Sequence, residues 1–522
     1  MPADPSLPHT HSGEDVVLGI LVVPPLSQGP DTRGHEQLLQ RYKAARPTPT
    51  SSRSRTMGSY DTDSKMEKGD SQVKVVYASD VEVVDAVFGE IHEDSGPNYR
   101  NVGWAGTTIL MCKATIGIGV LGIPFSLQVV GLIPGLIYLT AVMVIITWSN
   151  AVLGQFKRNH PEVYSISDAG RVIGGRVGYE FFAIAFLVYM VFCCGSSIVT
   201  IATALNAVSL HGACTAVFIA VAAVIGFLAS SVRTLGKMAW LGWVGMVTIM
   251  AAILTLTIAV TVQSRPSAAP KTGPWEKEFH TTRHATFTQT MSAIAAFIFA
   301  TNNPPTFFGF VSEMRDFRMY DRAMYTTQVF VWCTYVTIGT VVYYYCGQYV
   351  AIPALGSAGV LMKRVCYGLG LPGMIVTLAI YSHLAAKSLF VRILHGSRHL
   401  NTNTPTHWLT WLGCTLGCTV AEYIIASAIP IFGSLVSLIG ALLCPIVGII
   451  PFGVMWWYDN WRSVAPEKKT VLRRAKLAWA MSVTTIGCFI LVAGTYAAVL
   501  DIKANASHSK PWGCADNSNS VQ

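Results

Sequence analysis

The sequence predicts an all-α integral membrane protein with about eleven transmembrane helices, of which the first and the sixth are interrupted. Three observations support this prediction: the composition, a series of long apolar segments, and two clusters of helix-breaking residues inside those segments. Of the 522 residues, 52% are hydrophobic and only 12% are charged, and the mean hydropathy is +0.45. Because soluble globular proteins carry about 25% charged residues, this chain has too little polar surface to be one of them.

The charges and the cysteines exclude other classes of protein. The net charge of +9 does not indicate nucleic-acid binding, because the basic residues lie between apolar segments and form no basic face. The twelve Cys are not expected to form a disulfide framework, since pairs such as Cys193-Cys194 and Cys414/Cys418 lie inside apolar segments. No C-x-x-C pair occurs, so we expect no metal site and no cofactor.

Residues 1–95 differ from the rest of the chain. They are rich in Pro, Ser, Thr, Asp and Lys, a composition typical of disorder, and we expect a disordered cytoplasmic region. Three lysines in it, Lys65, Lys68 and Lys74, are candidate acceptors of ubiquitin, which makes the ubiquitin ligase machinery a candidate partner.

From Trp104 onward, apolar segments long enough to cross the hydrocarbon core of a bilayer, about 20 residues as a helix, follow one another. We expect a transmembrane domain over 96–500 and a short extracytoplasmic tail over 501–522. A strand-based barrel would instead show short alternating segments. The eleven predicted spans are 104–129, 131–154, 178–206, 212–231, 239–262, 287–312, 324–349, 367–391, 407–430, 432–457 and 476–500.

The loops between these spans predict the orientation. Counted with the N-terminus in the cytoplasm, the cytoplasmic loops hold about twice as many Lys and Arg as the outer segments. An odd number of spans then places the C-terminus outside. The sequon Asn505-Ala506-Ser507 lies in that outer tail, and Asn505 is therefore a candidate glycosylation site.

The first span contains the stretch GIGVLGIP, Gly117 to Pro124, which matches the G-x-G-x-x-G spacing of a dinucleotide-binding loop. Such a loop needs a preceding strand and an acidic residue about 20 positions later, whereas the first carboxylate after Gly122 is Glu162. The glycines either permit close helix packing or interrupt the helix. An interruption within the membrane is tolerated where the backbone lines a protected cavity.

The sixth span favours the second explanation. Its stretch FATNNPPTFFGF, Phe299 to Phe310, places two adjacent prolines inside an apolar segment, where a straight helix cannot continue. Two interrupted helices, each opening a set of five spans with opposite orientation, indicate a 5+5 inverted repeat with a binding site at the midplane.

Three motifs resemble those of a known family. They are GPNYRNVGW (96–104), KATIGIGVLGIP (113–124) and SEMRDFRMYDRAM (312–324). In this order they resemble the amino acid/auxin permease family, and within it the fungal neutral amino acid permeases of the methyltryptophan-resistance type. The resemblance covers about 83–500. It implies the leucine-transporter fold of the amino acid–polyamine–organocation superfamily, and secondary active, proton-coupled import of amino acids.

The resemblance also implies a substrate site between the two interruptions. The backbone of Ile116, Gly117, Ile118, Gly119 and Gly122 is expected to bind the α-carboxylate and α-amino groups of an amino acid, helped by the Thr115 hydroxyl. Across the site, the expected contacts are Thr301, Asn302, Asn303, Phe307 and Phe308. Tyr189, Cys193 and Ser196 of the third span are further candidates for its wall, with ordinary helix packing as the alternative.

Ionisable residues within spans are costly and often functional. Lys113, His383 and Glu422 are the candidates for proton coupling, with a buried structural hydrogen bond as the alternative for each. Lys387 lies near a helix end, where its side chain is expected to reach the interface. Sodium coupling, through carbonyls of the first interruption and hydroxyls such as Ser382, is the alternative to protons.

Composition and the two interruptions thus favour a transporter, and the resemblance implies a permease for neutral aliphatic and aromatic amino acids, with the lipid bilayer and an amino acid as its partners. A membrane sensor with little flux, which would use the N-terminal region for signalling, is a rival interpretation. A membrane-embedded enzyme is not expected, because no paired His or nucleotide motif occurs in the spans. The plasma membrane is the expected location, and the vacuolar membrane is the alternative.

Overall fold

The computed structural model describes residues 103–518, except 233–234, 271, 395–396, 398, 400–403, 464, 466–469 and 506–510. The predictions for the N-terminal region 1–95, including Lys65, Lys68 and Lys74, lie outside the described residues.

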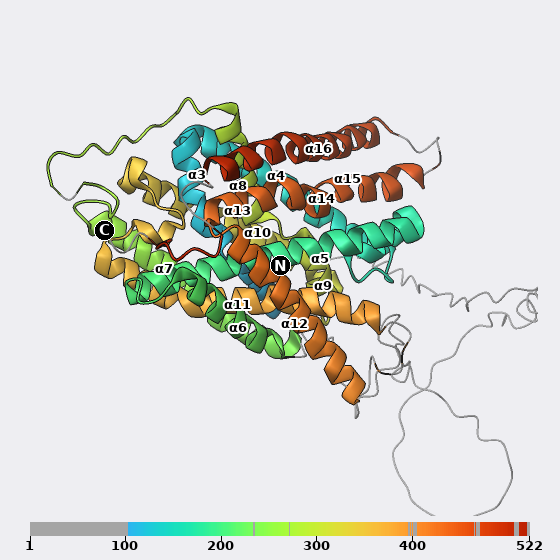
Figure 1. Cartoon of the computed structure of the whole chain (residues 1–522). Helices are drawn as coiled ribbons and strands as arrows, with labels where there is room; N and C mark the ends of the chain where they lie inside the picture. The colour runs from blue at the N-terminus through green and yellow to red at the C-terminus, as the bar shows by residue number, and fades with distance from the viewer. Residues whose placement is uncertain are drawn as a thin grey trace, which may run out of the picture. The chain divides into compact units, whose positions relative to one another are not determined.

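The described residues form helices joined mainly by short turns (Figure 1). The first half of the chain contains α2 (Trp104–Thr115), η1 (Gly119–Gly122), α3 (Ile123–Val130), α4 (Leu132–Asn159), α5 (Ile166–Ser209), α6 (Thr215–Ser230) and α7 (Leu235–Val262). The second half contains α8 (Phe287–Thr301), α9 (Pro304–Ser312), η2 (Phe317–Met319), α10 (Tyr320–Cys346), η3 (Gly347–Tyr349), η4 (Ala354–Ser357), α11 (Val360–Ile393), α12 (Pro405–Ala428) and α16 (Val471–Asn505). Between α12 and α16 lie α13 (Phe432–Leu438), η6 (Ile439–Leu443), α14 (Cys444–Gly448), α15 (Ile450–Trp457) and η7 (Tyr458–Arg462).

Each predicted span coincides with helix in the structure, but not all of them are continuous and long. Within the described part of the chain, nine helical segments are long and apolar enough to cross a membrane. The predicted span 212–231 contains the shorter helix α6, and the span 287–312 is divided into α8 and α9. The all-helical membrane fold is therefore confirmed, whereas the count of eleven spans stays a prediction.

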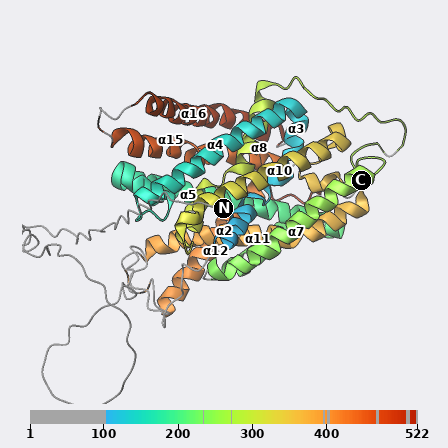
Figure 2. The ribbon, with the colours of Figure 1, turned by 180° about the vertical axis from the view of Figure 1, so that it is seen from behind.

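Helix α11 lies at the centre of one side of the bundle, where it packs against α5, α7, α6 and α12. Helices α4, α15 and α16 lie together on the other side, as both views show (Figures 1 and 2). Many large apolar side chains point outward, among them Val262 and Trp240, which are 80% and 70% exposed. An apolar exterior of this kind is expected where lipid replaces water as the solvent.

The structure corrects the prediction for the cysteines at one position. Cys214, at the start of α6, forms a disulfide with Cys514, 300 residues later in the chain. The tail around Cys514 is held by further contacts, since Asn206 Nδ2 donates to Asn517 Oδ1 at 2.8 Å and Trp512 N donates to Ser427 O at 3.2 Å. The C-terminal segment is thus fixed across the ends of α5, α6 and α12.

Candidate functional site

The first predicted interruption is present. Helix α2 ends at Thr115 because Ile116, with φ −82° and ψ 59°, leaves the helical conformation. Three non-helical residues follow, then the short 3₁₀ turn η1, and α3 begins at Ile123 with Pro124 in its first turn. A proline fits there because the first N–H groups of a helix have no intrahelical partner.

The second interruption lies between α8 and α9. Asn302, with φ −74° and ψ 79°, ends α8, and Pro304 and Pro305 occupy the first two positions of α9. The double proline is therefore compatible with the helix that follows it, for the same reason as Pro124. Asn302 and Asn303 form the actual gap between the two half-helices.

The two interruptions face each other at close range. A Cβ atom on Gly119 would lie 2.5 Å from Ala300 Cα, so only glycine allows this approach of η1 to the end of α8. Asn303 Nδ2 donates to Thr115 Oγ1 at 3.0 Å, and Asn150 Nδ2 of α4 donates to Asn303 Oδ1 at 2.7 Å. Asn303 therefore links the second interruption to the end of α2 and to α4.

Three tyrosines, of which Tyr189 and Tyr335 are buried and Tyr381 is partly buried, donate to the backbone carbonyls that the interruptions leave without helical partners. Tyr335 Oη of α10 lies 2.8 Å from both Thr115 O and Ala300 O, which share its single proton. Tyr381 Oη of α11 donates to Ala114 O at 2.6 Å, and Tyr189 Oη of α5 donates to Asn302 O at 2.9 Å. An unsatisfied buried carbonyl is costly, so these hydroxyls stabilise the unwound backbone. Sequence reasoning singled out only Tyr189 among them.

A small cavity lies between the interruptions. The volume that the centre of a water molecule can occupy in it is only about 20 Å³. One water molecule needs about 10–15 Å³ on this measure, so the cavity is nearly closed. Several predicted site residues line it together with Ala114, Phe299, Ala300 and Tyr381, namely Thr115, Gly117, Ile118, Gly119, Asn302, Tyr189 and Cys193.

Asn302 is the polar side chain most available to a ligand here. It is 4% exposed, and its amide nitrogen and oxygen have no hydrogen-bond partner among the described residues. Its side chain lies against the backbone of α14, because a Cβ on Gly448 would overlap Asn302 Oδ1.

The other predicted site residues lie beside the cavity and do not line it. Thr301 Oγ1 donates to Phe297 O of its own helix at 2.9 Å, and Ser196 Oγ likewise donates to Cys193 O at 2.8 Å. Phe307 packs on Phe310, with 6.1 Å between ring centroids. The remaining members of this group are buried around the cavity, namely Ile116, Gly122, Asn303 and Phe308.

Lys113 is the charged residue nearest to the first interruption. Its side chain is fully buried, and Nζ donates to Thr377 Oγ1 of α11 at 2.6 Å. The methylene next to Nζ lies against α7, where a Cβ on Gly245 would meet it at 2.7 Å. Lys113 thus connects α2 to α11 and α7, and no carboxylate pairs with it among the described residues.

His383 and Glu422 are buried at other places. His383 packs against Trp411 of α12, with 5.2 Å between ring centroids, although it shares α11 with the Lys113 partner Thr377. Glu422 of α12 has Ser382 of α11 and Cys194 of α5 as its polar neighbours. The structure therefore does not bring the three proton-coupling candidates together.

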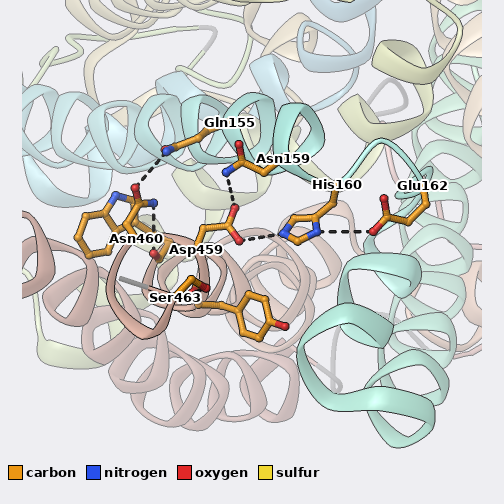
Figure 3. A network of polar contacts seen from close by, with 9 residues as sticks. Gln155, Asn159, His160, Glu162, Asp459, Asn460 and Ser463 are labelled. Atoms are coloured by element: carbon orange, nitrogen blue, oxygen red, sulfur yellow. Dashed lines mark hydrogen bonds and ion pairs between the residues drawn. The ribbon is translucent and has the colours of Figure 1, made fainter. Parts of the chain in front are cut away.

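Polar contacts join helix ends away from the cavity. Lys387 Nζ pairs with Glu313 Oε1 at 2.9 Å, so this lysine does more than reach the interface. Figure 3 shows a second group between the end of α4 and η7, where His160 Nε2 and Asn159 Nδ2 both contact the Asp459 carboxylate, at 2.9 and 2.8 Å.

Asn505, the glycosylation candidate, is the last residue of α16. Its Nδ2 donates to Asp501 O at 3.0 Å and lies 3.4 Å from Ser434 Oγ. Attachment of a glycan requires these contacts to break.

The family model described as transmembrane amino acid transporter protein matches residues 100–500. The chain belongs to this family. It is thus a transporter and not an enzyme, and the resemblance to amino acid/auxin permeases is confirmed. A transmembrane transporter of Gibberella moniliformis is 35% identical over 430 residues, which cover 82% of this chain and 90% of that protein. The N amino acid transport system protein of Neurospora crassa is 31% identical over 437 residues, or 81% of this chain and 90% of that protein.

Solved structures support the fold. A Na⁺-coupled sialic acid symporter in a substrate-bound outward-open state aligns with a TM-score of 0.50 and 10% identity, over 83% of this chain and 94% of its own. A nucleobase-cation-symport-1 family transporter in a closed conformation aligns with a TM-score of 0.50 and 12% identity, over 82% of this chain and 99% of its own. The transporter therefore has the leucine-transporter fold.

Proposed function

We propose that this transporter imports neutral aliphatic and aromatic amino acids by proton symport with alternating access. The observation that carries the proposal is the pair of interrupted helices whose ends meet at one buried cavity. The helix starts at Ile123 and Pro304 present positive dipole ends, which suit a carboxylate. Ile118, Phe299 and Ala300 give part of the cavity wall an apolar surface, and this suits an uncharged side chain.

Lys113 supports coupling to protons over sodium. An ammonium group within one turn of the first interruption repels a second cation bound at the same carbonyls. Two of those carbonyls, Ala114 O and Thr115 O, already accept hydrogen bonds from Tyr381 and Tyr335. Lys113 can bind and release a proton while it bridges α2 and α11. A change in its protonation can therefore change the contact between these two helices. His383 and Glu422 stay as secondary candidates.

The disulfide supports the proposed orientation. Disulfides persist in oxidising compartments, and Cys214 and Cys514 both lie on the side that the Lys and Arg distribution assigns to the exterior. We therefore place the N-terminus in the cytoplasm and the Cys214–Cys514 bridge outside the cell. The plasma membrane is the proposed location, with the vacuolar membrane as the alternative, since its lumen is also extracytoplasmic.

Uptake of labelled neutral amino acids into a permease-deficient cell tests the proposal. We expect uptake that a proton uncoupler abolishes and that replacement of sodium leaves unchanged. Uptake that requires sodium and is unchanged by the uncoupler would contradict proton symport. A protein that reaches the surface and transports no amino acid would instead support the sensor.

A further inference from the structure

A second cavity, of about 630 Å³, opens on the outside of the helix bundle between α4, α10, α15 and α16. Its size is within the range of ligand-binding pockets, about 300–1,000 Å³. The helices around it pack on one another, α4 against α10 and α15, and α15 against α16 (Figure 1). The groove contains none of the residues that line the cavity between the interruptions.

The groove is charged at one end and aromatic at the other. Arg158, Asp321 and Lys476 lie near the ends of α4, α10 and α16, and all three line it. Trp148 precedes Arg158 by ten residues on α4, which places it about 15 Å deeper along the helix. Trp148 and Trp479 meet edge to face, with 6.4 Å between their centroids, and Trp456 completes this aromatic part. A ligand with a polar head and an apolar chain would fit the groove, with its head at the charged end and its chain at the aromatic end.

The charges of the groove favour an anion. Arg158 Nη1 pairs with Asp321 Oδ2 at 2.9 Å, and both side chains remain partly exposed, at 39% and 45%. A guanidinium has five N–H donors, so Arg158 keeps donors for a ligand. Lys476 is exposed and forms no ion pair with the residues that the structure describes, which leaves the head of the groove with one net positive charge.

We propose that this groove binds an anionic glycerophospholipid. Its phosphate contacts Arg158 and Lys476, and one acyl chain lies along Trp148 and Trp479. Basic pockets between transmembrane helices at the membrane surface bind anionic headgroups, and Trp is favoured at that depth. With the N-terminus in the cytoplasm, as proposed above, the lipid comes from the cytoplasmic leaflet.

The groove adjoins the polar contacts that join α4 to η7 (Figure 3). Gln155 lines the groove and also donates from Nε2 to Asn460 Oδ1 at 3.1 Å. Asn159, the last residue of α4, and His160, which follows it, both contact the carboxylate of Asp459 in η7. A bound lipid therefore contacts the junction between the end of α4 and η7.

Native mass spectrometry of the purified full-length protein tests this proposal, with phosphatidylserine and phosphatidylcholine of identical acyl chains as probes. We expect tighter binding of phosphatidylserine. Lys476→Gln should weaken phosphatidylserine binding about fivefold, as expected for one surface cation, and should weaken phosphatidylcholine less, because the choline cation offsets the charge of its phosphate. Lys476→Arg should keep the preference. Trp479→Ala should weaken both lipids.

The matched controls are Lys503→Gln, at the other end of α16, and Trp240→Ala, an exposed tryptophan of α7. Both should bind lipid like the unmodified protein. Equal binding of the two lipids, or an equal loss in Lys476→Gln and Lys503→Gln, would overturn the proposal. A dimer that Trp479→Ala dissociates would also overturn it, because the groove would then be an interface between two copies.

Discussion

Replacement of Gly119 by Ala should stop transport without preventing insertion. The added Cβ would lie 2.5 Å from Ala300 Cα and 3.0 Å from Ala300 Cβ, whereas carbon atoms pack at about 3.5–4.0 Å. The first interruption and the end of α8 must therefore separate by about 1 Å. Overpacking of this kind costs about 1–3 kcal/mol. Displacements of about 1 Å reduce enzymatic rates by about 100-fold, so we expect uptake to fall at least about tenfold.

Gly122→Ala is the matched control, because it lies in the same 3₁₀ turn and a Cβ there meets no atom within 4 Å. Neither glycine has a positive φ, so the backbone conformation accepts alanine at both positions. The assay is initial uptake of a labelled neutral amino acid, divided by the amount of protein at the cell surface. Equal uptake by Gly119→Ala and Gly122→Ala would refute the close approach of the two interruptions as the basis of the site.

Three other predictions address separate features. Tyr335→Phe leaves Thr115 O and Ala300 O without their shared donor, so the thermal midpoint of the purified protein should fall, as expected for buried groups that cost about 1–3 kcal/mol each; an unchanged midpoint would show that these bonds contribute little. Lys113→Gln should give uptake, however slow, that no longer responds to an uncoupler or to external pH, and a preserved response would assign coupling to another group. After treatment of intact cells with an impermeant reductant, an impermeant maleimide should label the protein more strongly than without reductant. In the double variant Cys214→Ser/Cys514→Ser the reductant should not increase the labelling. If the reductant does not increase labelling of the unmodified protein, the proposed outer location of the disulfide is contradicted.

The fold was largely predictable because membrane helices leave a local signal. Each span needs about 20 apolar residues, and that pattern is read without any long-range information. The positions of both interruptions were predictable for the same reason, since Gly117 to Gly122 and Asn302 to Pro305 disfavour helix by their own backbone preferences. The division of the sixth span into α8 and α9 follows directly from Pro304 and Pro305.

The partners of the interruptions were not predictable, because they come from distant parts of the chain. Tyr335 and Tyr381 lie 220 and 267 residues from the carbonyls that they contact in α2. Tyrosine is common in membrane helices, and the sequence does not show which helix face meets the break. The Cys214–Cys514 disulfide joins residues 300 apart, although Cys214 at the outer end of a predicted span and Cys514 in the predicted outer tail were available as a signal. The sequence also does not show which way a side chain points next to an interruption. Phe307 was expected in the cavity wall, and in the structure its ring packs on Phe310.

The structure also implies that binding requires helix movement. A cavity of about 20 Å³ holds little more than one water molecule, so no amino acid fits between the interruptions as they stand. Hydrogen bonds join segments at both ends of the bundle: Tyr343 Oη accepts from His280 N at 3.2 Å at one end, and His160 contacts Asp459 at 2.9 Å near the opposite end. In the proposed alternating access, one of these sets of contacts breaks while the other holds. The tyrosine hydroxyls of α5, α10 and α11 already satisfy the unwound carbonyls in this closed arrangement, so the interruptions need no substrate to complete their hydrogen bonds.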